Sequence, residues 1–208
     1  MNVDAKPLAE LSRLERCLKP EGIPFTIPKH HILSYRCADD SPTTVVLQTG
    51  IVAVHRQSDE LLIGIATAPF IFGLTSDMLG NPSEYNIVAR TPCSGFYLPA
   101  IKNYQRIDEE NIWQDAFTWI LWINRLLQRR DMQLVGNNSY AQIRAMLLNM
   151  ATWDDNLRSK IGVMNHIQRS TRISRSVVAE VLAALREGNY ISMSRGKLVS
   201  VNRLPAEY

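Results

Sequence analysis

The spacing of apolar residues changes twice along the chain and predicts three kinds of segment. Leucines recur at helical spacing over residues 8–19, where Pro20 ends the predicted helix. The next region holds short runs rich in Val, Ile, Leu and Thr, separated by turn residues, and it predicts strands. These strands span 32–35, 43–48, 51–55, 61–66, 86–90 and 95–98. Many short strands at near-regular spacing are typical of a β-sandwich or a jelly-roll barrel.

The stretch from Asp108 to Leu134 has no Gly or Pro, and its apolar residues return to helical spacing. It predicts one helix of about 25 residues, about 38 Å long. This helix is too apolar for a surface helix, so we expect one face to lie on the barrel and another to contact a second copy of the chain. The stripe expected at the dimer contact is close to a heptad seam and consists of Ile112, Ala116, Trp119, Ile123 and Leu126. A helix buried within one domain is the alternative.

The C-terminal third has the pattern of a small helical domain with a hairpin. Residues 136–138 are Gly-Asn-Asn and break the long helix. Helical spacing then resumes in three segments, at 140–151, 162–168 and 173–185. Two short apolar runs, at 190–193 and 198–201, flank a polar turn and predict a β-hairpin. Helix, turn, helix and hairpin in this order predict a winged helix-turn-helix.

These elements predict an α+β chain in three parts. A β jelly-roll barrel is expected over residues 1–105, and a long connecting and dimerisation helix over 106–136. A winged helix-turn-helix DNA-binding domain is expected over 137–208.

Charge is distributed unevenly between these parts. Residues 1–136 hold 13 Lys and Arg against 15 Asp and Glu, whereas residues 137–208 hold 10 against 5. The span 158–203 carries nine basic residues and only two acidic ones, Glu180 and Glu187. A basic C-terminal third predicts a polyanionic partner, although many solvated surfaces are also basic.

Composition narrows the class of protein. The chain has 208 residues, 46% of them hydrophobic and 21% charged, which is typical of a globular protein with a core. The first ten residues do not resemble a signal peptide, and the longest apolar stretch, 65–74, is about half of a membrane span. We therefore expect a cytoplasmic protein with no membrane partner.

The second helix of the predicted helix-turn-helix begins with residues suited to DNA. Arg175 can donate two hydrogen bonds to guanine, and Ser174 and Ser176 can contact phosphate oxygens. Ala179, one turn further on, can touch a thymine methyl group. Ser174 also suits an N-cap, and an arginine at this place can instead be a solvated surface residue.

Four more basic residues surround this helix. Arg195 and Lys197 lie at the predicted wing tip and suit backbone phosphates, although an exposed hairpin without a ligand is the alternative. Arg169 and Arg172 fall in the turn between the helices, where general electrostatics or a turn role is favoured over base reading.

The segment SRSVVAEVLAALREGNYISMSRGKLVSV, residues 174–201, resembles the C-terminal domain of the catabolite-activator and fumarate-nitrate-reduction (CRP/FNR) superfamily of regulators. The resemblance implies that Arg175 is the main base reader and that Ser176, Ala179 and Glu180 take the next contact positions. The family usually has Glu at Ser176, and many members have Arg at Glu180, so a different DNA preference is expected. Arg172 stands where the family has the glycine of the helix-helix turn.

The same resemblance implies partners. A regulator of this kind binds double-stranded DNA as a homodimer, and its two recognition helices, about 34 Å apart, read a pseudo-palindromic operator. RNA polymerase is a further candidate partner.

The N-terminal region resembles a cyclic-nucleotide-binding barrel that has lost its key contacts. The family's Gly-Glu is Gly73-Leu74, and its Pro-Arg-Ser-Ala is Pro-Ser-Glu-Tyr at 82–85. A buried cyclic phosphate without a cationic partner is disfavoured, so we expect no binding of cyclic AMP or cyclic GMP. The degenerate pocket comprises Phe72, Gly73, Leu74, Ser83, Glu84 and Tyr85.

No cofactor or metal is expected. The three cysteines, Cys17, Cys37 and Cys93, match no zinc pattern, disulfide framework or iron–sulfur cluster. A haem is likewise not expected. His30 and His31 are adjacent, so they would point to opposite faces of a strand and make a poor metal site.

Within the superfamily, the chain is similar to the enterobacterial branch of inhibitors of hydrogen peroxide resistance. Its length, altered cassette and DNA-binding end carry this resemblance, which implies a role in repressing resistance to oxidative stress. The cysteines would then be candidate oxidant sensors through a thiolate, but the sequence places no basic or resolving partner beside them.

Two other classes of function compete with a DNA-binding regulator. An adaptor or anti-regulator that kept the fold but lost DNA contact is supported by the missing turn glycine and the missing family Glu. An enzyme is not expected, because the chain has no nucleophile elbow, HExxH, P-loop or GxGxxG motif. The adjacent Asp154 and Asp155 are better interpreted as turn or cap residues than as a catalytic pair.

Overall fold

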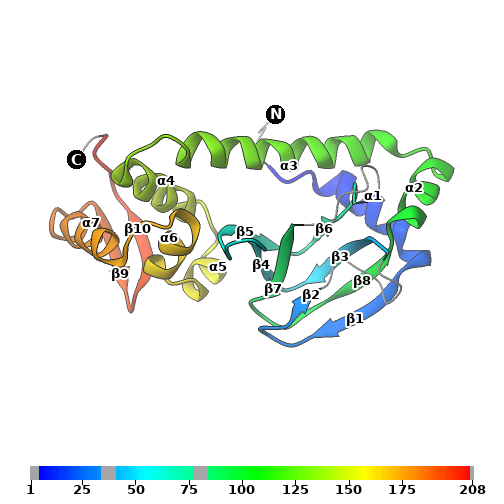
Figure 1. Ribbon diagram of the computed structural model, residues 1–208, viewed down its shortest axis with the longest axis horizontal. Coiled ribbons are helices and arrows are strands. Elements are labelled where there is room, and N and C mark those ends of the chain that lie inside the picture. The colour runs from blue at the N-terminus through cyan, green and yellow to red at the C-terminus, as the bar shows by residue number, and fades with distance from the viewer. Residues whose placement is uncertain (1–4, 34–40, 77–83, 207–208) are drawn as a thin grey trace. The chain divides into compact units, whose positions relative to one another are not determined.

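The structure is a computed structural model that describes residues 5–33, 41–76 and 84–206. Its packing divides the chain into two compact units, 1–126 and 127–208 (Figure 1). Cys37 and Ser83 lie outside the described residues, as do residues 34–35 of one predicted strand.

The first unit contains a β-barrel made of two antiparallel four-stranded sheets, as the jelly-roll pattern predicts. One sheet has the order β1-β8-β3-β6, with β1 at Ile23–Ile27, β8 at Cys93–Pro99, β3 at Thr43–Thr49 and β6 at Phe70–Phe72. The other has the order β2-β7-β4-β5, with β2 at Ile32–Leu33, β7 at Tyr85–Ala89, β4 at Ile51–Arg56 and β5 at Leu62–Thr67. The sequence pattern did not predict β1 and β6, which are short or rich in exposed residues.

The barrel core is continuous between the two sheets. In β3, Val45, Val46 and Leu47 are all at most 1% exposed, so this strand is covered on both faces. A tight turn at Gly50 joins β3 to β4 with φ of +99°. A Cβ atom there would lie 2.5 Å from the Cys93 sulfur, so both the backbone conformation and the space require glycine.

Helices at both ends of the barrel sequence complete the first unit. Helix α1 (Leu8–Leu18) buries three leucines, and the single turn η1 (Lys19–Glu21) follows it. The predicted long helix is in fact two helices, α2 (Ala100–Glu109) and α3 (Trp113–Leu134). Asn111 between them has φ of +52°, a left-handed conformation that Asn tolerates and that ends α2.

The stripe predicted as a dimer seam lies on the barrel instead. Ala116 and Trp119 are 2% and 1% exposed, and Ile112 and Ile123 pack against the same core. The Trp119 indole N–H donates to the carbonyl oxygen of Ile71 at 3.1 Å. The prediction is wrong for Ala116 and Trp119, because the barrel, rather than a second copy, buries their side chains. Ile112 and Ile123 are only partly buried against this core. Leu126 remains 37% exposed.

Four aromatic side chains fill the place where α3 crosses β6. Phe70 contacts Phe72, Trp119 and Trp122 with ring centroids 4.4, 5.0 and 6.0 Å apart. The Lys6 ammonium lies 5.6 Å from the centre of the Phe70 ring and donates to the carbonyl oxygens of Thr67 and Pro69. Burial lowers the pKa of this amine to about 8.

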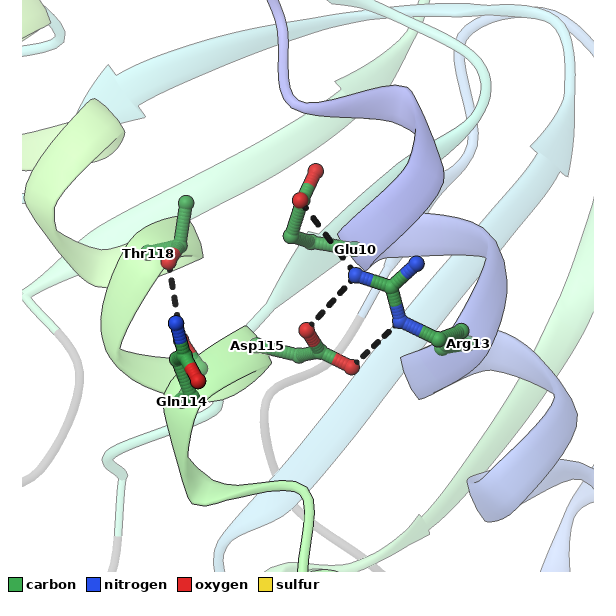
Figure 2. A network of polar contacts seen from close by, with 5 residues as sticks. All are labelled: Glu10, Arg13, Gln114, Asp115 and Thr118. Carbon is green, nitrogen blue, oxygen red and sulfur yellow. Dashed lines mark hydrogen bonds and ion pairs between the residues drawn. The ribbon is translucent and has the colours of Figure 1, made fainter.

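A two-pronged ion pair joins α1 to α3. The Nε and one terminal nitrogen of Arg13 each donate to Asp115 at 2.8 Å, and Glu10 accepts from Arg13 at 3.3 Å (Figure 2). Asp115 is only 8% exposed, so a partner of this geometry is what allows a carboxylate to lie there. Thr118 donates to the Gln114 carbonyl one turn along α3.

In the described residues of the second unit, the three predicted helices and the two-stranded hairpin form, together with one short helix that the sequence did not predict (Figure 1). The elements are α4 (Ser139–Ala151), α5 (Asp155–Lys160), α6 (Val163–Thr171), α7 (Arg175–Glu187), β9 (Ile191–Ser194) and β10 (Lys197–Val201). Its core includes Ile143, Leu147, Val163, Ile167, Val178 and Leu185, all fully buried. Helix α5, which the sequence pattern did not predict, accounts for the adjacent acidic residues Asp154 and Asp155. Asp154 is its N-cap and accepts from the Leu157 amide at 2.9 Å, while Asp155 lies in the first turn.

Within the described residues, no helix combines the length and apolar character that crossing a membrane requires.

Candidate nucleic-acid interface

The turn between α6 and α7 forms without a glycine. Arg172 has φ of +62° and takes the left-handed conformation for which the resembling family uses glycine. Its amide donates to the Gln168 carbonyl at 2.9 Å. The Thr171 hydroxyl donates to the Ile167 carbonyl at 2.8 Å and accepts from the Ile173 amide at 3.3 Å. The helix-turn-helix geometry is therefore intact in this chain.

Ser174 caps the helix that follows the turn. Its hydroxyl oxygen accepts from the Val177 amide at 3.4 Å and lies 3.1 Å from the Ser176 hydroxyl. The cap places Arg175 at the first helical position, beside backbone amides that carry the positive end of the helix dipole. This end of α7 is thus suited to a negatively charged partner.

Helix α7 has one buried and one exposed face. The buried face consists of Val178, Val181, Leu182 and Leu185, each at most 7% exposed. The structure brings the predicted contact residues together on the exposed face, and these are Arg175, Ser176, Ala179 and Glu180, with Ser174 at its start. Within the part of the chain that the structure describes, Arg175 makes no hydrogen bond or ion pair.

The wing is a hairpin with a tight turn at its tip. Arg195 and Gly196 both have positive φ, of 48° and 76°, as expected for a two-residue hairpin turn. The Lys197 ammonium donates to the Lys160 carbonyl at 3.0 Å, and the Val163 amide donates to the Gly196 carbonyl at 3.0 Å. These bonds tie the wing tip to the end of α5 and the start of α6. One Lys197 donor is thus occupied, while the Arg195 side chain is exposed.

Basic side chains outnumber acidic ones among the exposed residues of α6, α7 and the wing. Arg169 and Arg172 are exposed beside the turn, although Arg172 has a further partner within the chain. Sequence reasoning missed Lys160 and Arg203, which are also exposed in this unit. Their place in the basic span was visible, but no spacing connected them to the predicted helices. The predicted interface is therefore a basic surface with Glu180 as a negative residue on its central helix.

The residues of the predicted effector pocket separate into two groups. Phe72 and Leu74 are each 6% exposed and belong to the barrel core. Gly73 between them has φ of +68°, and a Cβ there would lie 2.4 Å from the Thr43 carbonyl oxygen. Glu84 and Tyr85 are exposed, and Ser83 lies outside the described residues. An apolar side chain thus occupies position 74, where the family places a carboxylate.

The two described cysteines are buried free thiols. Burial raises the pKa of both Cys17 and Cys93. The Cys17 sulfur donates to the Arg106 carbonyl, and the Cys93 sulfur to the Thr91 carbonyl. A raised pKa leaves little thiolate at neutral pH, so neither environment favours reaction with an oxidant. Among the described residues, no group of three or more His, Cys, Asp or Glu could hold a metal ion.

Comparison with known proteins agrees with this architecture. A family described as winged helix-turn-helix DNA binding matches residues 139–206. The chain is 46% identical, over 98% of its length and 98% of the relative's, to the inhibitor of hydrogen peroxide resistance of Escherichia coli K12.

Solved structures share the fold of most of the chain. The c-di-GMP responsive global regulator CLP of Xanthomonas campestris superposes with a TM-score of 0.71 over 92% of this chain and 99% of that one, at 14% identity. A transcriptional regulator of the CRP/FNR family from Eubacterium rectale superposes with a TM-score of 0.65 over 92% and 90%, also at 14% identity. Together these likenesses show a CRP/FNR-type fold.

Proposed function

Because the chain belongs to the family of the inhibitor of hydrogen peroxide resistance, we propose that it is a transcription regulator that reads double-stranded DNA with its winged helix-turn-helix. The observation that carries this proposal is the exposed start of α7. An unpaired Arg175 there lies beside a Ser174 cap and free backbone amides. This is the part of a recognition helix that reaches base edges in the major groove.

The exposed face of α7 suits base reading of a particular kind. Arg175 can form a bidentate contact with O6 and N7 of guanine. Glu180 can accept from the N4 amino group of cytosine, and Ala179 offers a methyl group to thymine. Ser176 can contact a base or a phosphate oxygen. A negative Glu180 beside phosphates also disfavours sites where it lacks a cytosine partner, which adds selectivity.

Phosphate contacts would come from the rim of this face. Arg169 and Arg172 flank the turn, and Arg195 and Lys197 lie at the wing. These contacts set affinity and register without reading sequence, and each one makes binding more sensitive to salt.

We assign the dimer contact to the outward face of α3 rather than to the predicted seam. This face exposes large apolar side chains at helical spacing: Trp113, Phe117, Ile120, Leu121 and Leu127. Phe117 is 61% exposed and Leu121 is 47% exposed, which is unusual for such residues unless a partner covers them. A second copy of the same face is self-complementary and supports a homodimer on a pseudo-palindromic operator. RNA polymerase is a further partner proposed for DNA-bound dimers.

The barrel is proposed to bind no cyclic nucleotide. Leu74 cannot accept a hydrogen bond from a ribose hydroxyl, and Phe70, Phe72, Trp119 and Trp122 pack against one another beside it. Neither a haem nor an iron–sulfur cluster is proposed, and no enzymatic activity. The name of the Escherichia coli relative suggests control of hydrogen peroxide resistance as the biological role.

Selection from a pool of genomic fragments tests the proposal. The purified protein is incubated with sheared DNA at two salt concentrations, and the bound fragments are sequenced. We expect one enriched motif with two-fold symmetry and half-sites about 34 Å apart. Equal recovery of all fragments at both salt concentrations would overturn the proposal and favour the adaptor, which keeps the fold without reading DNA.

A further inference from the structure

One side chain of α3 contacts the helix-turn-helix directly. Arg130 lies in the last two turns of α3, within the second unit. Its terminal nitrogen donates to the carbonyl oxygen of Ser170 at 3.3 Å, forty residues away in sequence. Ser170 is 5% exposed, and Arg130 is half-buried. The guanidinium therefore contacts the last turn of α6 at a point that solvent barely reaches.

The carbonyl that Arg130 contacts has no amide partner within its helix. The last four carbonyls of a helix lack such partners, and each needs another donor. In α6, the Arg172 amide donates to the Gln168 carbonyl. Arg130, which lies on α3, donates a hydrogen bond to the Ser170 carbonyl. Its positive charge also suits the negative end of the α6 dipole.

The position of this contact matters for the recognition helix. Ser170 precedes Arg172, whose left-handed backbone turns the chain, and Ser174, which starts α7. Left-handed backbone is unfavourable for a residue other than glycine, by about 1 kcal/mol or more, and it persists where the surroundings hold it. A donor that binds the Ser170 carbonyl, two residues before Arg172, therefore helps to hold the turn that orients Arg175.

We infer that Arg130 is a positioning residue for DNA reading: it caps α6 from α3 and so fixes the turn in front of α7. The inference rests on the proposed function, because the recognition helix is what it positions. Arg130 acts through the turn and makes no contact with DNA. Since α3 begins in the first unit, the turn is held by the helix that the two units share.

The test compares Arg130→Met with Arg125→Met, a matched loss of one arginine from an exposed position on the same helix. Three quantities are measured: affinity for the selected operator and for unrelated DNA, the dependence of affinity on salt, and amide hydrogen exchange at residues 171–178. For Arg130→Met we expect operator affinity to fall about tenfold, as for the loss of a charge-assisted hydrogen bond. Affinity for unrelated DNA and the salt slope should stay as in the wild type, and amides of the turn should exchange faster. Arg125→Met should match the wild type in all three.

Two results would overturn the inference. A salt slope reduced by about one in Arg130→Met, with equal weakening on all DNA, would mean that Arg130 contacts a phosphate. Unchanged exchange at the turn would mean that the cap does not hold it. Exchange is measured without DNA, so it decides the role of Arg130 even if the wild type selects no operator and the proposed function fails. If Arg130→Met does not fold, Arg130→Gln, which keeps a polar side chain but removes the charge and the reach of the guanidinium, gives the same comparison.

Discussion

The two units of this chain differ in which side chains they bury and which they expose. In the first unit, aromatic side chains pack between β6 and α3, Leu74 is buried in the barrel core, and both described thiols are buried. In the second unit, arginines and serines lie exposed around the start of α7, on a framework of fully buried aliphatic residues. The contrast supports the proposal that the winged helix-turn-helix, rather than the barrel, carries the binding chemistry of this chain.

The largest effect is expected from removing the aromatic closure. Trp119→Ala deletes a 1% exposed indole and leaves the Ile71 carbonyl without its donor. We expect the free energy of unfolding of the first unit to fall by about 3–5 kcal/mol. This free energy is measured by denaturant titration, with a spectroscopic signal from the barrel as the readout. Ile101→Ala, at a 51% exposed position on α2, is the control and should lower it by about 1 kcal/mol or less. Equal losses in the two variants would contradict the proposed closure.

The outward face of α3 should control assembly. The double variant Phe117→Glu/Leu121→Glu places two carboxylates on this face, and a dimer would have to bury them in an apolar contact. We expect the double variant to weaken association by at least about 30-fold and to be monomeric at micromolar concentration. Light scattering with size-exclusion chromatography measures it. Gln114→Glu adds one charge at an exposed polar position and serves as the control. A double variant that stays dimeric would move the dimer contact away from this face.

A smaller effect is expected at the cap of the recognition helix. Ser174→Ala removes the oxygen that accepts from the Val177 amide. We expect the second unit to lose about 1 kcal/mol of stability, with a similar loss of operator affinity. Thermal unfolding and fluorescence anisotropy measure the two. Ser192→Ala changes an exposed serine of β9 and should leave both unchanged. If Ser174→Ala matched Ser192→Ala, the cap would have no energetic role.

The smallest expected effect concerns the thiols, which should react slowly in the folded protein at neutral pH. Burial raises the pKa of Cys17 and Cys93, so the thiolate is scarce at pH 7 and increases only as the pH rises toward the raised values. With Cys37→Ser as background, we expect both to react with a thiol reagent at least about tenfold slower than free cysteine at pH 7. Unfolding in denaturant should restore the normal rate. Fast reaction of either thiol in the folded state would contradict this prediction and make that cysteine a candidate oxidant sensor.

The fold was largely predictable because its signals are local. Short strand runs, helical stripes and the Ser174 cap are visible in the sequence and appear in the structure. The break at Asn111 was not predicted, because neither a Gly nor a Pro marks it and a left-handed Asn depends on its neighbours.

The faces of α3 could not be assigned from the sequence. Two apolar stripes run along this helix, and periodicity alone does not say which one the barrel covers. The candidate site was likewise only partly predictable from the sequence. Arg175 follows from its place in the motif, whereas the role inferred for Arg130 depends on a contact forty residues away that no spacing rule reveals.

The most direct test of the central claim is an anisotropy titration of wild type, Arg175→Met and Arg186→Met on the selected operator. The same operator with its predicted guanine replaced is titrated beside it. Arg186 is exposed on the second half of α7 and provides the matched control. We expect Arg175→Met to lose about 1–3 kcal/mol on the operator and to bind both DNAs equally, while Arg186→Met discriminates as the wild type does. An Arg175→Met protein that still discriminates between the two DNAs would contradict the claim that α7 reads DNA through this residue.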